Sequence, residues 1–173
     1  MDILDIFIQA VGVVAMFFSV FSYQMNKHKQ IMFMQIVATG LFGLQYFMLG
    51  AITGMAACAI GVVRGFVFYH KDKKWARWNG FIVLFIIAFI ISGILTWQGP
   101  LSVLMIVAFV LSTFSFSFTK PMLVRATILI SSPMMLVFDI LTGSIGGIIN
   151  EILVEVSSVV GLLRYDIKWK KKA

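Results

Sequence analysis

Seven apolar runs of about twenty residues each constrain this chain more than any other feature. A helix of that length crosses a bilayer core about 30 Å thick. With 61% hydrophobic and 12% charged residues, the chain holds more apolar surface than a soluble domain of its length can bury. The sequence predicts an all-α membrane protein, one membrane domain over residues 1–173, with transmembrane helices at 4–23, 31–49, 51–69, 80–97, 100–118, 122–141 and 143–164.

The basic residues gather at alternate ends of these runs, which fixes the expected orientation. The positive-inside rule places such ends in the cytoplasm, so we expect the N-terminus outside and the C-terminus inside, with a basic cytoplasmic tail at 166–173. Because Met1–Asp5 carries no basic residue, we expect the first run to be retained as a span. The residues that mark the cytoplasmic side are Lys27, Lys29, Lys71, Lys73, Lys74, Arg77, Lys120, Arg125, Arg164, Lys168, Lys170, Lys171 and Lys172.

The net charge of +7 therefore does not indicate nucleic-acid binding. Basic residues beside a span orient it or contact lipid headgroups, so membrane lipids are the expected partners and nucleic acid is not. Four tryptophans near the predicted span ends fit interfacial anchors: Trp75, Trp78, Trp97 and Trp169.

An internal repeat is visible when the chain is overlaid on itself at an offset of 93 residues. This offset predicts a 3+1+3 parallel repeat, with a first three-helix unit at 1–70, a linker helix at 80–97 and a second unit at 100–165. Parallel repeats occur in transporters, whose sites lie between the repeats. The identities between positions 14 and 54 and their counterparts are Val14/Val107, Ala15/Ala108, Ser19/Ser112, Phe21/Phe114, Ser22/Ser115, Lys27/Lys120, Gly50/Gly143, Ile52/Ile145 and Gly54/Gly147.

The last apolar run carries Asn150, Glu151 and Glu155. A carboxylate in hydrocarbon costs roughly 2.5–3.5 kcal/mol, so it normally faces protein or water. Glu151 and Glu155 are four residues apart, which puts them on one helix face. Their repulsion requires either that a cation neutralises one of them or that one carries a proton, which would imply coupling to the proton gradient. Interhelical hydrogen bonds are the alternative role for this polar face.

Arg64 lies inside a predicted span and has two readings. At 1.5 Å per residue it is about 21 Å from the outer face, and Glu155 is about 18 Å from it. The similar depth predicts an Arg64–Glu155 ion pair across the central axis, with Glu151 facing the solute. Alternatively, Arg64 snorkels to the cytoplasmic interface, which is close to Tyr69.

Further polar residues lie within the predicted spans and suit hydrogen bonding to a solute or to another helix. Gln45 and Tyr46 are expected near the outer mouth, Asp139 toward the outside, and Cys58 as a small packing residue. The predicted substrate-binding residues are Gln35, Thr39, Gln45, Arg64, Ser131, Ser132, Asn150, Glu151 and Glu155.

Four stretches resemble the YgjV-type bacterial inner-membrane proteins: SYQMNKHKQIMFMQIVATGLFGLQYFMLGAITG (22–54), GVVRGFVFYHKDKKW (61–75), SSPMMLVFDILTGSIGGIINE (131–151) and GLLRYD (161–166). That family is similar in layout to the SWEET/MtN3 sugar carriers and the PnuC vitamin-precursor carriers. The resemblance implies a multi-pass protein of the bacterial inner membrane and passage of small polar solutes between two helical triplets.

We therefore expect a transporter for a small polar solute (sugar-, nucleoside- or vitamin-like) that works by alternating access between its halves. A non-transporting membrane scaffold or assembly protein is the alternative, and a membrane-embedded enzyme acting on lipid is a third. The sequence has no His-Glu-x-x-His motif and no glycine-rich phosphate loop, so we predict no enzyme activity, no catalytic residue, no metal ligand and no cofactor. Substrate, direction and homo-oligomer formation are left open.

Overall fold

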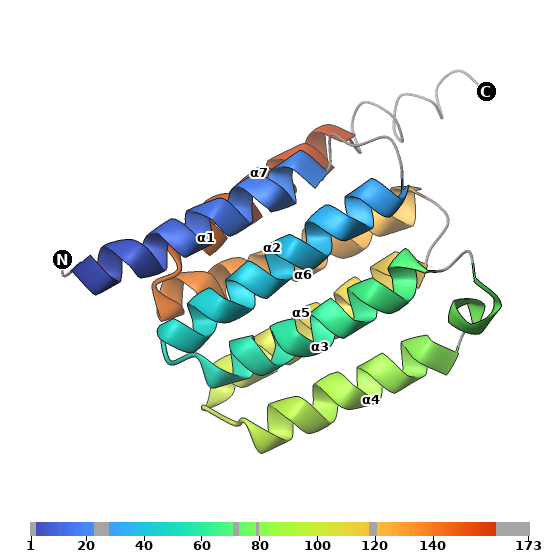
Figure 1. Cartoon of the computed structure of the whole chain (residues 1–173), viewed down its shortest axis with the longest axis horizontal. Coiled ribbons are helices and arrows are strands. Elements are labelled where there is room, and N and C mark those ends of the chain that lie inside the picture. The colour runs from blue at the N-terminus through green and yellow to red at the C-terminus, as the bar shows by residue number, and fades with distance from the viewer. Residues whose placement is uncertain (1–2, 23–27, 71–72, 79, 118–120, 162–173) are drawn as a thin grey trace.

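The part of the chain that the computed structural model describes, residues 3–22, 28–70, 73–78, 80–117 and 121–161, contains seven α-helices and no strand. Helices that follow one another in the chain run antiparallel (Figure 1). They are α1 (Ile3–Ser22), α2 (His28–Met48), α3 (Ile52–Tyr69), α4 (Gly80–Leu95), α5 (Pro100–Ser117), α6 (Pro121–Thr142) and α7 (Ile145–Gly161), with a 3₁₀ turn, η1 (Lys74–Arg77), before α4. The prediction of an all-α chain with seven helices is confirmed.

Helix ends fall close to the predicted span ends, with two differences of note. Helix α2 begins at His28 rather than at 31, and α4 ends at Leu95 rather than at 97. Beyond Leu95, the side chain of Gln98 donates to the carbonyl of Gly50 (2.9 Å) and accepts from the amide of Thr53 (3.1 Å). These bonds tie the α4–α5 turn to the α2–α3 turn. The predicted basic tail at 166–173 lies outside the described residues.

Six helices close into a ring, and α4 lies outside it (Figure 1). Helix α1 packs against α2 and α7, α3 packs against α2 and α5, and α6 packs against α5 and α7, while α4 covers α3 and α5. The ring therefore has two layers, α1–α2–α3 and α7–α6–α5, which meet at their edges. Helices α2 and α6 occupy the middle of these layers and face each other.

The α2–α3 and α6–α7 turns have the same construction. Gly50 and Gly143 adopt φ values of 74° and 76°, in the left-handed region that glycine enters without steric cost. In each turn, the next amide reaches back to a carbonyl five residues earlier, Ala51 to Tyr46 (2.8 Å) and Ser144 to Asp139 (2.9 Å). This is the Schellman pattern that ends a helix and satisfies its last carbonyls.

Helices α1 and α7 are in backbone contact where they cross. A Cβ atom added to Gly146 would lie 2.2 Å from the backbone carbonyl carbon of Gly12, so the two helix backbones touch with no side chain between them. Close approach of backbones at small residues is how helices associate in lipid, where hydrocarbon offers no hydrophobic driving force for packing.

The described helices carry apolar side chains on the outside and bury several polar ones beside an apolar core. Buried positions include Gln45, Arg64 and Asp139, whereas Ile94 and Leu95 are 66% and 79% exposed. By length and composition, two helices of the described residues, α1 and α3, are apolar enough to cross a membrane, and α2, α4, α5 and α6 contribute shorter apolar stretches. An apolar exterior with polar groups held inside suits lipid as the surrounding solvent.

Candidate functional site

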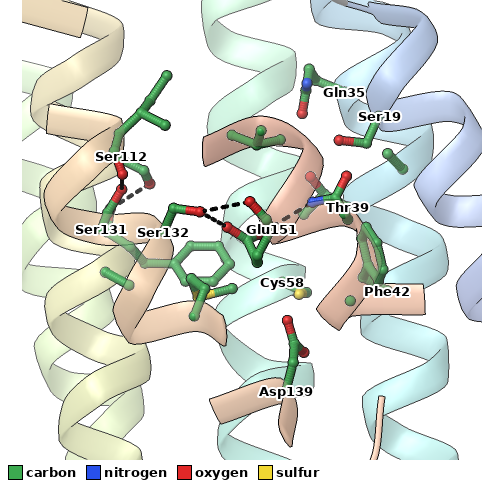
Figure 2. Close-up of a pocket in the computed structure, with 18 of the residues that line it drawn as sticks. Ser19, Gln35, Thr39, Phe42, Cys58, Ser112, Ser131, Ser132, Asp139 and Glu151 are labelled. Atoms are coloured by element: carbon green, nitrogen blue, oxygen red, sulfur yellow. Dashed lines mark hydrogen bonds between the residues drawn. The ribbon is translucent and has the colours of Figure 1, made fainter. Parts of the chain in front are cut away.

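A cavity of about 410 Å³ lies inside the ring and is lined by residues from all six of its helices. The described lining contains three charged side chains, Arg64, Asp139 and Glu151, together with hydroxyl, amide and aromatic groups. Figure 2 shows several of these side chains converging from different helices on the same space. The cavity is therefore the candidate binding site.

Glu151 of α7 is held in the cavity by two donated hydrogen bonds. The hydroxyl of Ser132 on α6 donates to Oε2 at 2.5 Å, and the side-chain amide of Asn150 donates to Oε1 at 3.1 Å. Figure 2 shows the Ser132–Glu151 contact near the centre of the cavity. Both carboxyl oxygens thus receive a hydrogen, which fixes the orientation of the side chain.

Asp139 of α6 forms the second acidic position. Its Oδ1 accepts a 2.6 Å hydrogen bond from the hydroxyl of Tyr46 on α2, so the bond links the two helices that face each other across the ring. The side chain is 1% exposed. Gly147 leaves room for it, because a Cβ at that position would lie 2.4 Å from the Asp139 carboxyl carbon. The Tyr46 ring packs edge-on against Phe138, with ring centroids 5.5 Å apart.

Arg64 of α3 is directed at α5. Its Nη1 donates to the Phe109 carbonyl (3.2 Å), the Ser112 hydroxyl (2.8 Å) and the Thr113 hydroxyl (2.7 Å). The guanidinium carbon lies 5.4 Å and 5.7 Å from the ring centroids of Phe89 and Phe109. Such contacts favour a cation held against aromatic faces.

Neither sequence reading of Arg64 matches this arrangement. Within the described residues, no ion pair joins Arg64 to Glu155, because the guanidinium is engaged on α5. The side chain is 6% exposed, so it does not snorkel to the interface either. Hydroxyls of α5, which look unremarkable in the sequence, take the role that was expected of the carboxylate.

Most predicted site residues do line the cavity: Gln35, Thr39, Arg64, Ser131, Ser132, Asn150 and Glu151. Gln35 also donates to the Ser22 hydroxyl at 2.6 Å. Glu155 is half-buried and is not among the described lining residues. Glu155 lies on the same face one helical turn beyond Glu151, about 6 Å further along the α7 axis.

Gln45 is buried away from the cavity, at the end of the bundle that holds the glycine turns. It donates to Gln9 (3.3 Å) and accepts from Ser144 (2.9 Å), and its side chain covers Gly12. This network joins α1 and α2 to the α6–α7 turn, so Gln45 bridges these elements at the end where the sequence predicts the outer mouth.

Sequence reasoning did not include Ser19, Tyr46, Cys58, Ser112 and Asp139 among the binding residues, although all five line the cavity. One signal could have found all five. Ser19 and Ser112 are 93 positions apart, as are Tyr46 and Asp139, and Cys58 is 93 positions before Glu151.

The same spacing pairs most of the lining residues. Seven pairs of cavity residues are separated by 93 positions: Ser19/Ser112, Gln35/Ile128, Ala38/Ser131, Thr39/Ser132, Phe42/Met135, Tyr46/Asp139 and Cys58/Glu151. Each pair takes one residue from α1–α3 and one from α5–α7. Among these seven pairs, Ser19/Ser112 keeps the same residue, and the other six differ.

The described lining of the cavity offers few side chains that could bind a metal ion. The described part of the chain contains no group of three or more His, Cys, Asp or Glu residues close enough to hold a metal ion. The single cysteine, Cys58, is buried and carries a free thiol. The arrangement offers hydrogen bonding and charge to a ligand.

Comparison with known proteins gives one match. No curated protein and no solved structure matches the chain. A family model for bacterial inner membrane proteins, Imp-YgjV, matches residues 6–168, a range that extends from within α1 past the end of α7. This match agrees with the apolar exterior of the helical ring and shows the inner-membrane location. The chain belongs to the YgjV family of bacterial inner membrane proteins.

Proposed function

We propose that the protein carries a small polar solute across the inner membrane by exposing the central cavity to one side at a time. The observation that carries this proposal is a cavity of about 410 Å³ lined by polar groups from six helices. Small-molecule sites measure about 300–1,000 Å³, so the space suits a small solute. Ionisable residues inside a membrane commonly mark a solute pathway.

The proposed moving parts are the two triplets, α1–α3 and α5–α7, with α4 as the linker. Two observations support treating them as repeats: the seven pairs of cavity residues at a spacing of 93, and the matching turns at Gly50 and Gly143. In transporters built from repeats, the site lies at the repeat interface, and one repeat rocks against the other. The likeness in layout to the SWEET and PnuC carriers stays a prediction.

In this proposal the structure represents a state closed toward the predicted outer side. Tyr46 and Asp139 lie within one turn of the helix ends at Met48 and Thr142, so their hydrogen bond crosses the cavity near that end. The Gln45–Ser144 bond lies beside it. Opening outward requires these contacts between helices to break.

A scaffold role is the second candidate, and Arg64 is the observation in its favour. Its bonds to Ser112 and Thr113 hold α3 to α5, as polar side chains do between helices in lipid. A scaffold, however, has no use for a cavity that holds a carboxyl group. Transport accounts for both the cavity and the Arg64 contact.

Ligand-dependent thermal unfolding of the purified full-length chain tests the proposal. We expect at least one class in a panel of sugars, nucleosides, vitamins and amines to raise the melting temperature of the wild type. Glu151→Gln should lose that shift, whereas Asp5→Asn, a matched charge removal at an exposed position of α1, should keep it. Failure of every compound to stabilise the wild type over Glu151→Gln contradicts transport and favours the scaffold.

A further inference from the structure

Two buried acceptor atoms in the cavity are left without a donor. Among the side chains that the structure describes, Asn150 Oδ1 and Asp139 Oδ2 accept no hydrogen bond. Asn150 is 6% exposed and Asp139 is 1% exposed, and both residues line the cavity. Buried polar atoms are almost always paired, so these two positions call for donors supplied from within the cavity.

The orientation of Asn150 follows from its neighbour. An ionised carboxylate can only accept hydrogen bonds, so Asn150 must present its NH₂ group to Glu151 Oε1, as it does at 3.1 Å. The amide oxygen then points elsewhere. The unpaired acceptor is therefore a consequence of the Glu151 contact, and the cavity holds an oxygen that is free to receive a donor.

Both acidic side chains lie among groups that can donate hydrogen bonds to an ionised carboxylate. Ser132, Asn150 and Tyr46 all donate toward carboxyl oxygens. No group in these three contacts is positively charged. Hydrogen bonding stabilises the carboxylates without neutralising them.

The charged groups of the described lining do not balance. The lining holds two acids, Asp139 and Glu151, and one base, Arg64. When all three are ionised, one negative charge is in surplus. The guanidinium lies on the α5 side, against the rings of Phe89 and Phe109. In the described part of the chain, no ion pair links it to either carboxylate. A carboxylate inside a membrane needs a countercharge, and a bound solute can supply it.

The size and walls of the cavity favour an organic cation over a bare metal ion. A space of about 410 Å³ exceeds what one ion fills, and the described residues hold no metal-ligand cluster. Phe42 and Tyr46 contribute aromatic rings to the lining, and the Tyr46 hydroxyl is bonded to Asp139. Aromatic faces bind ammonium groups by cation–π attraction.

We infer that the solute of the proposed transporter is a small organic cation with donor groups, held between Asp139 and Glu151 with Asn150 Oδ1 as an additional acceptor. Figure 2 shows Glu151 and Asp139 on the same cavity, with Cys58 between them in the view. This inference rests on the proposed function and adds the chemical class of its solute.

Matched probes test the charge preference at constant shape. The first pair is choline and its neutral isostere 3,3-dimethyl-1-butanol, and the second set is benzylammonium, benzyl alcohol and benzoate. Binding to the full-length chain is measured by thermal shift and by titration calorimetry. We expect one cationic probe to bind at least about tenfold more tightly than its neutral partner, and benzoate to give no shift.

Variants then locate the binding. Glu151→Gln and Asp139→Asn keep side-chain shape and remove a charge, and each should weaken cation binding by about tenfold or more while leaving the neutral probe unchanged. Glu151→Asp should retain the preference for the cation, which separates loss of charge from loss of folding. Asp5→Asn should bind as the wild type does, which shows that removing a carboxylate elsewhere does not weaken binding; partition of the probe into detergent would give the same signal in every variant.

Each outcome decides one of the two claims. Cation binding that depends on Asp139 and Glu151 supports the inference, and uptake of that cation by proteoliposomes supports transport as well. Binding without uptake keeps the ligand class and rejects transport. Uptake of a neutral sugar or nucleoside with no response to cations overturns the inference and leaves transport standing. The absence of binding by every cationic probe overturns the inference, and the panel of sugars, nucleosides and vitamins then decides transport.

Discussion

Tyr46 donates a 2.6 Å hydrogen bond to Asp139, which lies 93 positions further along the chain. The same spacing separates Cys58 from Glu151 and Thr39 from Ser132, which also line the cavity. The bond therefore joins corresponding positions of α2 and α6, the two helices that face each other across the ring.

Tyr46→Phe removes the hydroxyl and keeps the ring. Asp139 Oδ1 then loses the hydrogen bond that it accepts from Tyr46. A hydrogen bond to a charged group contributes about 1.5–3 kcal/mol to stability. We expect a lower melting temperature in a thermal unfolding assay. Tyr69→Phe serves as the matched control and should leave stability unchanged. Tyr69 ends α3, far along that helix from the Gly50 turn. Equal melting temperatures for the two variants would show that the Tyr46–Asp139 bond does not stabilise the contact between α2 and α6.

Arg64→Ala should destabilise the bundle by several kcal/mol, because it removes three hydrogen bonds to α5 and the aromatic contacts with Phe89 and Phe109. Arg64→Lys keeps the charge but not the planar group, so we expect partial recovery. Chemical unfolding in mild detergent measures both. Full stability in Arg64→Ala would contradict the role given to this contact.

Gly146→Ala places a methyl group against the α1 backbone at Gly12, where nothing can move aside cheaply. Overpacking of this kind costs about 1–3 kcal/mol, so we expect a lower melting temperature and poorer recovery of folded protein. Gly40→Ala is the matched control, because its Cβ would meet Val62 at an ordinary 3.8 Å. The account predicts that Gly40→Ala is neutral or stabilising; similar losses in both variants would count against the tight α1–α7 crossing.

Glu151→Gln and Glu155→Gln compare a residue that lines the cavity with one that is not among its described lining residues. For any solute that binds the wild type, we expect Glu151→Gln to lower the affinity about tenfold or more and Glu155→Gln to change it less than about twofold. Titration of both variants in one detergent measures the difference. A larger effect at Glu155 would place the solute outside the cavity described above.

The sequence predicts the helices well because the physical signal is local. Apolar length sets each span, and glycine marks the turns at Gly50 and Gly143. The position of α4 outside the ring is not readable in this way, since helix partners in lipid are chosen by side-chain packing.

Within the site, Glu151, Asn150 and Ser132 were predicted because polar groups in a span are expensive and need a reason. The partners of Arg64 were missed, because Ser112 and Thr113 resemble any hydroxyl residue of an apolar helix. For Asp139 the sequence predicts only a position toward the outer side, because the residue lies close to a helix end. The spacing of 93 between Asp139 and Tyr46 is present in the sequence, but their contact depends on how α2 and α6 pack.

The single thiol of Cys58 reports directly on the central claim, a hydrated cavity open to one side at a time. Sealed right-side-out and inside-out vesicles are treated with a membrane-impermeant cationic thiosulfonate, and modification of Cys58 is quantified by mass spectrometry. The account predicts modification from the cytoplasmic side in the wild type and, in Tyr46→Phe, from the outer side as well. Absence of modification from either side, with full reaction after unfolding in SDS, would show a dry bundle and contradict the account.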